Sequence, residues 1–245
     1  MIRAVVFDLD GTLIQTERLK AQSYAQAAVQ LKPDSLTEQE VIDAFSDFVG
    51  GSREEVTKGL LARFDLEEAA RKRMDEFSAS APWQVLARLR LQIYQEIISN
   101  ENTLRDAAWP HNMTLLHQIQ AANCTLGLAT MSHCDQVERS LRALDLEGAF
   151  NFIASREDVD NPKPDPEIYL LVARALGVLP SEMIVIEDSV SGVRAALAAG
   201  AAVLAVATPM TKTQLHQSGL LNEELIVDSP TDLQEKMANL FRKFN

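Results

Sequence analysis

Two carboxylates one residue apart close the first apolar run of the chain and could carry chemistry. Asp8 is the next-to-last residue of the strand-like run 4–9, Asp10 directly follows this run, and Gly11 comes next. Residues i and i+2 of a strand point to the same face, so continued extended geometry would aim both carboxylates at one spot. Crowded like charges need a cation, and hard carboxylate oxygens suit Mg²⁺. A solvated acidic turn with ordinary Asp-Gly turn chemistry is the alternative.

Polar groups suited to phosphoryl chemistry also follow two later segments. Thr130 and Ser132 come after the apolar run 124–129, where hydroxyls and backbone amides can hold a phosphate oxygen, although Ser and Thr are also common helix caps. Lys163 stands between two prolines, which fix its backbone and hold a cation where negative charge must be neutralised without rearrangement. A solvent-facing lysine in a stiff turn is the alternative at this position.

A second acidic strand end occurs at Glu187 and Asp188, directly after the apolar run 183–186. A helix pattern follows, and either Asp188 or Ser189 could serve as its N-cap. Capping would account for one of these residues. It does not explain why an acidic strand end recurs in the same chain.

The elements that must position these groups form an alternating pattern of apolar runs and helical segments. This alternation is typical of βαβ units and predicts an α/β fold with a doubly wound parallel sheet. In such sheets ligands bind beyond the carboxyl ends of the strands. Strands are predicted at 4–9, 124–129, 152–154, 183–186 and 202–206, with a short edge strand at 225–227, and helices at 112–122, 135–144, 166–176 and 191–199.

One long stretch, residues 15–100, interrupts the alternation and shows no convincing strand. Capping boxes at Thr37 and Ser52 predict two helix starts within it. The sequence therefore predicts a Rossmann-like core of residues 1–14 and 101–245 with an inserted all-helical cap domain of residues 15–100. An insertion rooted directly after the acidic motif is well placed to act as a lid, and a helical appendage that adds only stability or a dimer surface is the alternative. Apolar residues recur along one helical face, for example at Leu86, Leu89, Ile93 and Ile97.

Composition and charge narrow the class of protein. The chain has 245 residues with 23 Lys and Arg against 35 Asp and Glu, a net charge of -12, which argues against a nucleic-acid partner because such a groove needs a basic stripe. Cys124 and Cys134 form neither a metal-ligand spacing nor a disulfide framework and fit a reducing compartment. No signal-peptide pattern opens the chain, and no apolar run reaches the ~18 residues of a membrane span. We expect a cytoplasmic monomer that does not bind membranes.

Taken together, these motifs resemble the haloacid dehalogenase superfamily over essentially the whole chain. The motifs that carry the resemblance are Asp8-Leu9-Asp10-Gly11-Thr12, Thr130, Lys163 and Glu187-Asp188. The helical insertion resembles the α-helical cap of the subgroup that holds β-phosphoglucomutase, phosphoglycolate phosphatase and many sugar-phosphate phosphatases. The run from Glu187 through Gly192 resembles the β-phosphoglucomutase-like branch in particular.

The resemblance implies a catalytic role for four residues. Asp8 would be the nucleophile that forms an aspartyl-phosphate, and Asp10 would protonate the leaving oxygen and then deprotonate the attacking water. Thr130 would hydrogen-bond the transferring phosphoryl group, and Lys163 would offset its charge and that of Asp8. The acid at Asp10 favours phosphate ester chemistry over carbon–halogen cleavage, because halide needs no protonation.

The resemblance also implies a Mg²⁺ cofactor. A carboxylate oxygen of Asp8, the backbone carbonyl of Asp10 and the side chain of Asp188 would hold the ion in an octahedron. The role of Glu187 stays open at this point: it could be a direct ligand, or it could orient a water that binds the metal.

Substrate contacts are expected from Thr16, Lys20, Gly51, Arg53 and Ser132. Lys20 replaces the His that the mutase uses near its general acid, and it could contact a second anionic group of the substrate or be a solvated helix lysine. Arg53 at a helix start is unfavourable for the helix dipole, which hints at an anion-facing role, and a polar surface arginine is the alternative.

The sequence thus favours a Mg²⁺-dependent phosphatase, a phosphoric monoester hydrolase acting on a small phosphorylated metabolite, with a sugar phosphate as the preferred class. A phosphomutase of the β-phosphoglucomutase type is the first alternative. A non-catalytic member that binds a ligand or partner is the second, and the four intact residues Asp8, Asp10, Lys163 and Asp188 argue against it.

Overall fold

The computed structural model describes residues 1–48, 52–122 and 124–244, and the chain divides into two compact units. The core unit comprises Met1–Gln15 and Leu104–Asn245, and the helical unit comprises Thr16–Thr103. The boundary between them falls within helix α6 (Glu101–Asp106). None of the helices in the described part of the chain combines the length and apolarity needed to cross a membrane.

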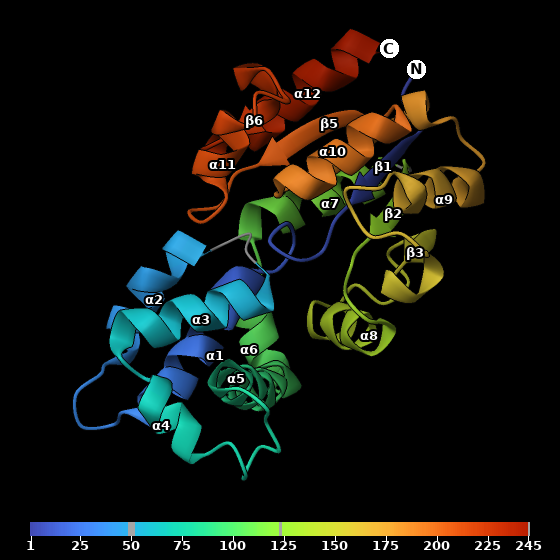
Figure 1. Cartoon of the computed structure of the whole chain (residues 1–245). Coiled ribbons are helices and arrows are strands. Elements are labelled where there is room, and N and C mark those ends of the chain that lie inside the picture. The colour runs from blue at the N-terminus through green and yellow to red at the C-terminus, as the bar shows by residue number, and fades with distance from the viewer. Residues whose placement is uncertain (49–51, 123, 245) are drawn as a thin grey trace. The chain divides into compact units, whose positions relative to one another are not determined.

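The core unit is built on a six-stranded parallel sheet with the strand order β3-β2-β1-β4-β5-β6 (Figure 1). Strand β1 is central and pairs with both β2 and β4. The chain therefore winds outward from β1 in two directions, which is the doubly wound arrangement that the alternation predicted. The strand bounds are Ala4–Phe7 for β1, Thr125–Ala129 for β2, Phe152–Ala154 for β3, Met183–Glu187 for β4, Ala202–Val206 for β5 and Ile226–Val227 for β6.

Helices cover both faces of this sheet. On one face α9 and α10 contact each other and the sheet, and on the other α7 and α12 do the same (Figure 1). The helix bounds are Pro110–Ala121 for α7, Cys134–Ala143 for α8, Glu167–Leu176 for α9, Val190–Ala199 for α10, Lys212–Gln217 for α11 and Leu233–Phe244 for α12, with 3₁₀ turns η2 (Arg156–Asp158), η3 (Pro180–Glu182), η4 (Glu223–Leu225) and η5 (Pro230–Asp232).

The alternation of side chains along β1 and β4 decides what their ends can reach. All residues of both strands are buried, as expected for a parallel sheet covered on two faces. Val6 and Val185 belong to the apolar cluster formed with α9 and α10. Because side chains alternate with a period of two, Asp8 and Glu187 continue the face of these two valines, toward the α9 side of the sheet.

The predicted strands agree closely with the observed ones, and two of them, 152–154 and 202–206, coincide. The largest difference is at the first strand, which ends at Phe7 rather than Leu9. Asp8 N still donates to Ile186 O at 3.0 Å, but the carbonyl of Leu9 then accepts from Leu13 N and Ile14 N in a tight turn. Hydrogen bonding within this turn replaces strand pairing, so the acidic motif lies in a loop.

The described residues of the helical unit form helices and no strand. Its elements are α1 (Thr16–Leu31), α2 (Glu38–Phe45), η1 (Ser46–Phe48), α3 (Arg53–Phe64), α4 (Glu67–Lys72) and α5 (Pro82–Ser99). Helix α5 packs against α1, α3 and α4, and α1 also packs against α2. Both predicted capping boxes are present, at Thr37 with Glu40 and at Ser52 with Glu55.

Candidate active site

Three neighbouring strands carry the polar groups that the sequence singled out. Asp8 follows β1, Thr130 follows β2, and Glu187 is the last residue of β4. These strands lie side by side in the order β2-β1-β4. The site therefore lies at the carboxyl ends of the strands where the winding direction changes, which is where open α/β sheets bind ligands.

Lys163 connects the ends of all three strands. Its Nζ donates to Asp8 Oδ1 at 2.8 Å, to Glu187 Oε1 at 2.6 Å and to the backbone oxygen of Ala129 at 3.0 Å. Only 6% of the lysine side chain is exposed, and its ammonium also lies 5.0 Å from the ring centroid of Tyr169. A buried ammonium needs this full set of partners, because an unpaired charge in the interior is costly.

Glu187 accepts hydrogen bonds at both carboxylate oxygens. Oε1 accepts from Lys163 Nζ and from Tyr169 Oη at 2.8 Å. Oε2 accepts from Asp188 N at 3.0 Å, Ser189 N at 3.1 Å and Ser189 Oγ at 3.0 Å. A Cβ at position 192 would overlap this carboxylate, so Gly192 is required for the close approach of α10. Five donors hold the Glu187 carboxylate in one orientation.

Burial and charge set the protonation of the Asp8–Lys163 pair. Burial raises the pKa of Asp8 to about 7, against the opposing effect of Lys163. Burial alone would lower the pKa of Lys163, but Asp8 and Glu187 outweigh it and hold the pKa of the lysine well above its usual range. Lys163 is therefore a permanent cation beside a carboxylate whose own charge is sensitive to its surroundings.

Asp10 lies on the side of the hydroxyl-bearing loop. Its Oδ2 accepts from Thr130 Oγ1 at 3.2 Å and from the hydroxyl of Ser132. Thr130 Oγ1 in turn accepts from Ser132 N at 3.0 Å. The two hydroxyls therefore orient the Asp10 carboxylate, a contact that the sequence analysis did not anticipate.

The donor set of the cluster fits a magnesium ion. Asp8, Glu187 and Asp188 are buried, and each offers a carboxylate oxygen within 4.8 Å of the others. Hard oxygen donors of this kind are what Mg²⁺ prefers. Gly11, at φ +87°, lies so close to Asp188 that a Cβ there would overlap its carboxylate. Only glycine allows the turn after Asp10 to approach Asp188 in this way.

The remaining predicted substrate residues belong to the helical unit, except Ser132. Thr16 is the first residue of α1 and is buried. Lys20, one turn further, pairs with Glu17 at 2.6 Å. Arg53 is the first residue of α3 and is exposed. Gly51 lies outside the described residues.

Sequence reasoning missed Tyr169 and the carbonyl of Ala129 as members of the cluster. Tyr169 is fully buried in α9, yet its hydroxyl reaches Glu187. Its spacing alone marks it as a core residue, so the sequence holds no signal for this hydrogen bond. The Ala129 carbonyl is a backbone group at a strand end, and backbone acceptors are not visible in residue types.

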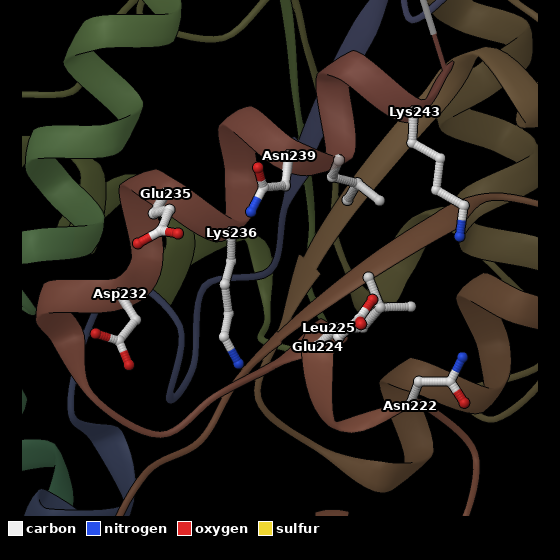
Figure 2. Close-up of a pocket in the computed structure, with 9 residues that line it drawn as sticks. Asn222, Glu224, Leu225, Asp232, Glu235, Lys236, Asn239 and Lys243 are labelled. Carbon is white, nitrogen blue, oxygen red and sulfur yellow. The ribbon is translucent and has the colours of Figure 1, made fainter.

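A separate pocket in the core unit is not part of this cluster. Figure 2 shows it between η4 and α12. None of the residues drawn there is Asp8, Glu187 or Asp188, the three carboxylates of the buried cluster. Lys236, the central cation in that view, donates to the backbone oxygens of Glu223 at 3.0 Å and Ile226 at 2.5 Å. Its ammonium therefore fixes the start of β6.

The fold and the cluster define an α/β protein of the Rossmann-like type, with acidic residues at the switch point of a doubly wound parallel sheet. The model of the haloacid dehalogenase-like hydrolases matches residues 5–206, and the chain belongs to this family. This confirms the predicted resemblance. The predicted enzyme class, a phosphoric monoester hydrolase, is also confirmed, because curated relatives are phosphatases.

Two such relatives and one solved structure show the extent of the similarity. The phosphorylated carbohydrates phosphatase of Thermotoga maritima is 30% identical over 81% of this chain and 82% of the relative. The phosphoglycolate phosphatase of Shigella boydii is 32% identical over 81% of this chain and 79% of the relative. A HAD family hydrolase from Deinococcus radiodurans R1, with bound phosphate and sodium, is 25% identical, with a TM-score of 0.71 over 97% of this chain and 96% of that one.

Proposed function

We propose that the chain is a Mg²⁺-dependent phosphatase that hydrolyses a small phosphorylated metabolite through an aspartyl-phosphate on Asp8. The observation that carries this proposal is the buried contact of Lys163 with Asp8 at the ends of three adjacent strands. This arrangement keeps a carboxylate nucleophile beside a fixed cation, which is what attack on an anionic phosphoryl group requires.

In the first step a carboxylate oxygen of Asp8 attacks the substrate phosphorus. A bond forms between that oxygen and phosphorus while the bond from phosphorus to the leaving oxygen breaks, and Asp10 donates a proton to the leaving oxygen. The hydroxyls of Thr130 and Ser132 hold Asp10 for this transfer. Lys163 offsets the charge that Asp8 shares with the phosphoryl group.

In the second step water attacks the phosphorus of the aspartyl-phosphate. Asp10 accepts a proton from this water, the bond between phosphorus and Asp8 breaks, and inorganic phosphate leaves. One carboxylate thus serves as acid and then as base, so Asp10 returns to its starting protonation state after each turnover.

Asp8 and Asp188 would hold the magnesium ion together with the backbone carbonyl of Asp10, and the bound ion would neutralise charge on the transferring phosphoryl group. We assign Glu187 to a positioning role rather than to the metal. Its two oxygens already accept from five donors, and losing them to a metal would release Lys163 and the start of α10. Of the two roles that the sequence left open for Glu187, we propose this one.

The relatives favour a phosphorylated carbohydrate or a phosphorylated small acid as the substrate class. The mutase alternative expects a His at position 20, where this sequence has Lys20. Within the helical unit this lysine forms an ion pair with Glu17. A mutase would need a bisphosphate to regenerate its phosphoenzyme, so the two functions separate in one assay.

Phosphate release from sugar phosphates, 2-phosphoglycolate and 4-nitrophenyl phosphate, with Mg²⁺ and with EDTA, tests this proposal. We expect Mg²⁺-dependent release from at least one metabolite, and no release from a chain carrying Asp8→Asn. Isomerisation of a hexose phosphate that depends on added hexose bisphosphate, without phosphate release, would instead establish the mutase. Activity that EDTA leaves unchanged would contradict the metal assignment.

A further inference from the structure

The loop that carries Lys163 is tied down by a carboxylate of the helix that follows it. Lys163 lies in the segment 159–166, between η2 and α9. Glu167, the first residue of α9, accepts from Asp160 N at 3.0 Å and from Asn161 N at 2.8 Å, with one carboxylate oxygen for each. The side-chain amide of Asn161 donates to the second of these oxygens at 3.0 Å. One carboxylate therefore holds the backbone two and three residues before the lysine.

The prolines of this loop limit how else it can be anchored. Positions 162, 164 and 166 are prolines, and a proline has no backbone N–H to donate. Asp165 N donates to the carbonyl oxygen of Pro162 at 3.0 Å, which closes a turn inside the loop. A bond of that kind shapes the loop but does not join it to the rest of the protein. The bonds to Glu167 do join it, because they connect the loop to a helix.

Helix α9 gives the Glu167 carboxylate a rigid base. Ile168 and Tyr169, the next two residues, are fully buried, and α9 packs against β2 and β3 of the sheet. Glu167 N donates to Asp165 Oδ1 at 3.0 Å, which fixes the first turn of the helix. The loop that Glu167 holds is therefore fixed relative to the strand ends that form the candidate site.

Lys163 depends on such anchoring because its contacts are so closely set. Its ammonium meets acceptors from three strand ends at 2.6 to 3.0 Å, so a small displacement of its backbone would lose at least one of them. Misplacement of a catalytic group by about 1 Å can lower turnover by about a hundredfold. The backbone amide of Asp160, and after it that of Asn161, hold the pKa of the Glu167 carboxyl below its usual range, so the tie stays ionised at neutral pH.

We propose that Glu167 is a positioning residue of the active site, which holds the loop 160–163 so that Lys163 reaches its three acceptors at once. Glu167 bonds to the loop and not to the reacting groups, so it acts through the lysine. Its effect on turnover rests on the proposed phosphatase function. Its effect on the placement of Lys163 does not depend on that function.

Glu167→Gln tests the proposal with little disturbance, because it keeps the shape of the side chain but replaces one accepting oxygen with a group that only donates. With Mg²⁺ and 4-nitrophenyl phosphate, kcat should fall by about ten- to a hundredfold. KM should stay nearly unchanged, since Lys163 offsets charge in the transition state. Glu40→Gln is the matched control, because Glu40 accepts from Thr37 N at 2.9 Å at the start of α2, and this variant should keep the wild-type kcat.

Labelling with acetic anhydride reports on the lysine without any need for turnover. The side chain of Lys163 is 6% exposed, whereas Lys72 is exposed on α4, so Lys163 should be acetylated far more slowly in the wild type. Peptide mass spectrometry of the full chain measures both lysines in one sample. The ratio of Lys163 to Lys72 labelling should rise several-fold in Glu167→Gln and keep its wild-type value in Glu40→Gln.

The proposal is overturned by a wild-type kcat in Glu167→Gln. It is also overturned by a fall in kcat that leaves the labelling of Lys163 unchanged or that occurs equally in Glu40→Gln. Should Glu167→Gln fail to fold, Asn161→Asp carries the test, because its carboxylate cannot donate to Glu167 and repels it; unchanged kcat and labelling in that variant would then overturn the proposal. If the wild type hydrolyses no ester, the proposed phosphatase fails, and the labelling ratio alone decides whether Glu167 positions Lys163.

Discussion

Two buried cations, one in each unit, have opposite surroundings. In the core unit the ammonium of Lys163 contacts two carboxylates and a backbone carbonyl. In the helical unit the guanidinium of Arg90 lies between two tyrosine rings, with no carboxylate partner among the described residues. Lys163 is compensated by carboxylates and can organise one of them for chemistry, whereas Arg90 is held by aromatic rings without an ion pair among the described residues.

The largest expected effect concerns the carboxylate that Lys163 organises. Asp8→Asn keeps the shape of the side chain but replaces the anionic carboxylate with a neutral, weakly nucleophilic amide, so turnover should fall by more than about 10³-fold while the fold is retained. Steady-state kinetics with circular dichroism would measure both. Asp34→Asn, an exposed aspartate elsewhere in the chain, is the matched control, and residual activity of Asp8→Asn near the wild-type level would remove Asp8 as the nucleophile.

The comparison of the two cations can be tested by removing each charge in turn. Lys163→Met leaves Asp8 and Glu187 facing each other without a cation and should lower the free energy of unfolding by about 3 kcal/mol, since breaking one side of a buried pair is strongly destabilising. Arg90→Met should change it by less than about 1 kcal/mol or raise it, because it replaces an uncompensated buried charge with an apolar chain. Urea unfolding of both variants without metal measures the difference, and equal losses would show that the two buried cations do not differ in how the protein compensates them.

A smaller effect is expected for Tyr169, whose hydroxyl donates to Glu187 in the cluster. Tyr169→Phe removes one hydrogen bond to a buried carboxylate and should cost about 1 kcal/mol of stability. If Tyr169 positions Glu187 and Lys163, kcat should fall a few-fold with KM unchanged. Loss of stability with wild-type kcat would limit Tyr169 to a packing role.

The smallest effect is expected for a third cation that faces solvent. The ring nitrogens of His216 lie 3.0 Å from carboxylate oxygens of Glu223 and Asp228. The hydrogen bond to Asp228 is the main cause that raises the pKa of His216 above the usual 6.5, and the hydrogen bond to Glu223 is the second. A raised pKa in the folded state means that the stabilisation is complete below about pH 6.5 and is lost as pH rises through the folded value.

Unfolding temperatures of His216→Gln and the wild type, compared at about pH 6 and about pH 9, measure this contribution. The wild type should exceed the variant more at the lower pH, because the imidazolium is charged there. A difference that is the same at both pH values would show that the two carboxylates do not stabilise the protonated ring.

The sequence predicted the positions of the core cluster well because they depend on short local patterns. One apolar run ends at Asp8 and another ends at Glu187, and each pattern predicts the carboxyl end of a buried strand. A parallel sheet places these strand ends at the same edge, so the two acids come together. The contacts of Lys163 with Glu187 and Ala129 could not be predicted, because they depend on how the loop before α9 folds back.

The surroundings of Arg90 show the same limit in the helical unit. Arg90 falls between Leu86 and Ile93 on the apolar face of its helix, so the periodicity alone marks it as a buried charge. What it contacts there depends on the packing of α5 against α1, which brings Tyr24 to it from a distant part of the chain. Helical periodicity contains no information about such a partner.

Trapping the phosphoryl group on the enzyme tests most directly whether Asp8 is the nucleophile. A single turnover with substrate and Mg²⁺ is quenched in acid, the protein is reduced with borohydride, and the peptide that contains Asp8 is sequenced by mass spectrometry. We expect homoserine at position 8, because borohydride reduces an aspartyl-phosphate, and none in the sample without substrate. Phosphate found instead on a serine or histidine, or turnover with Asp8 never modified, would contradict it.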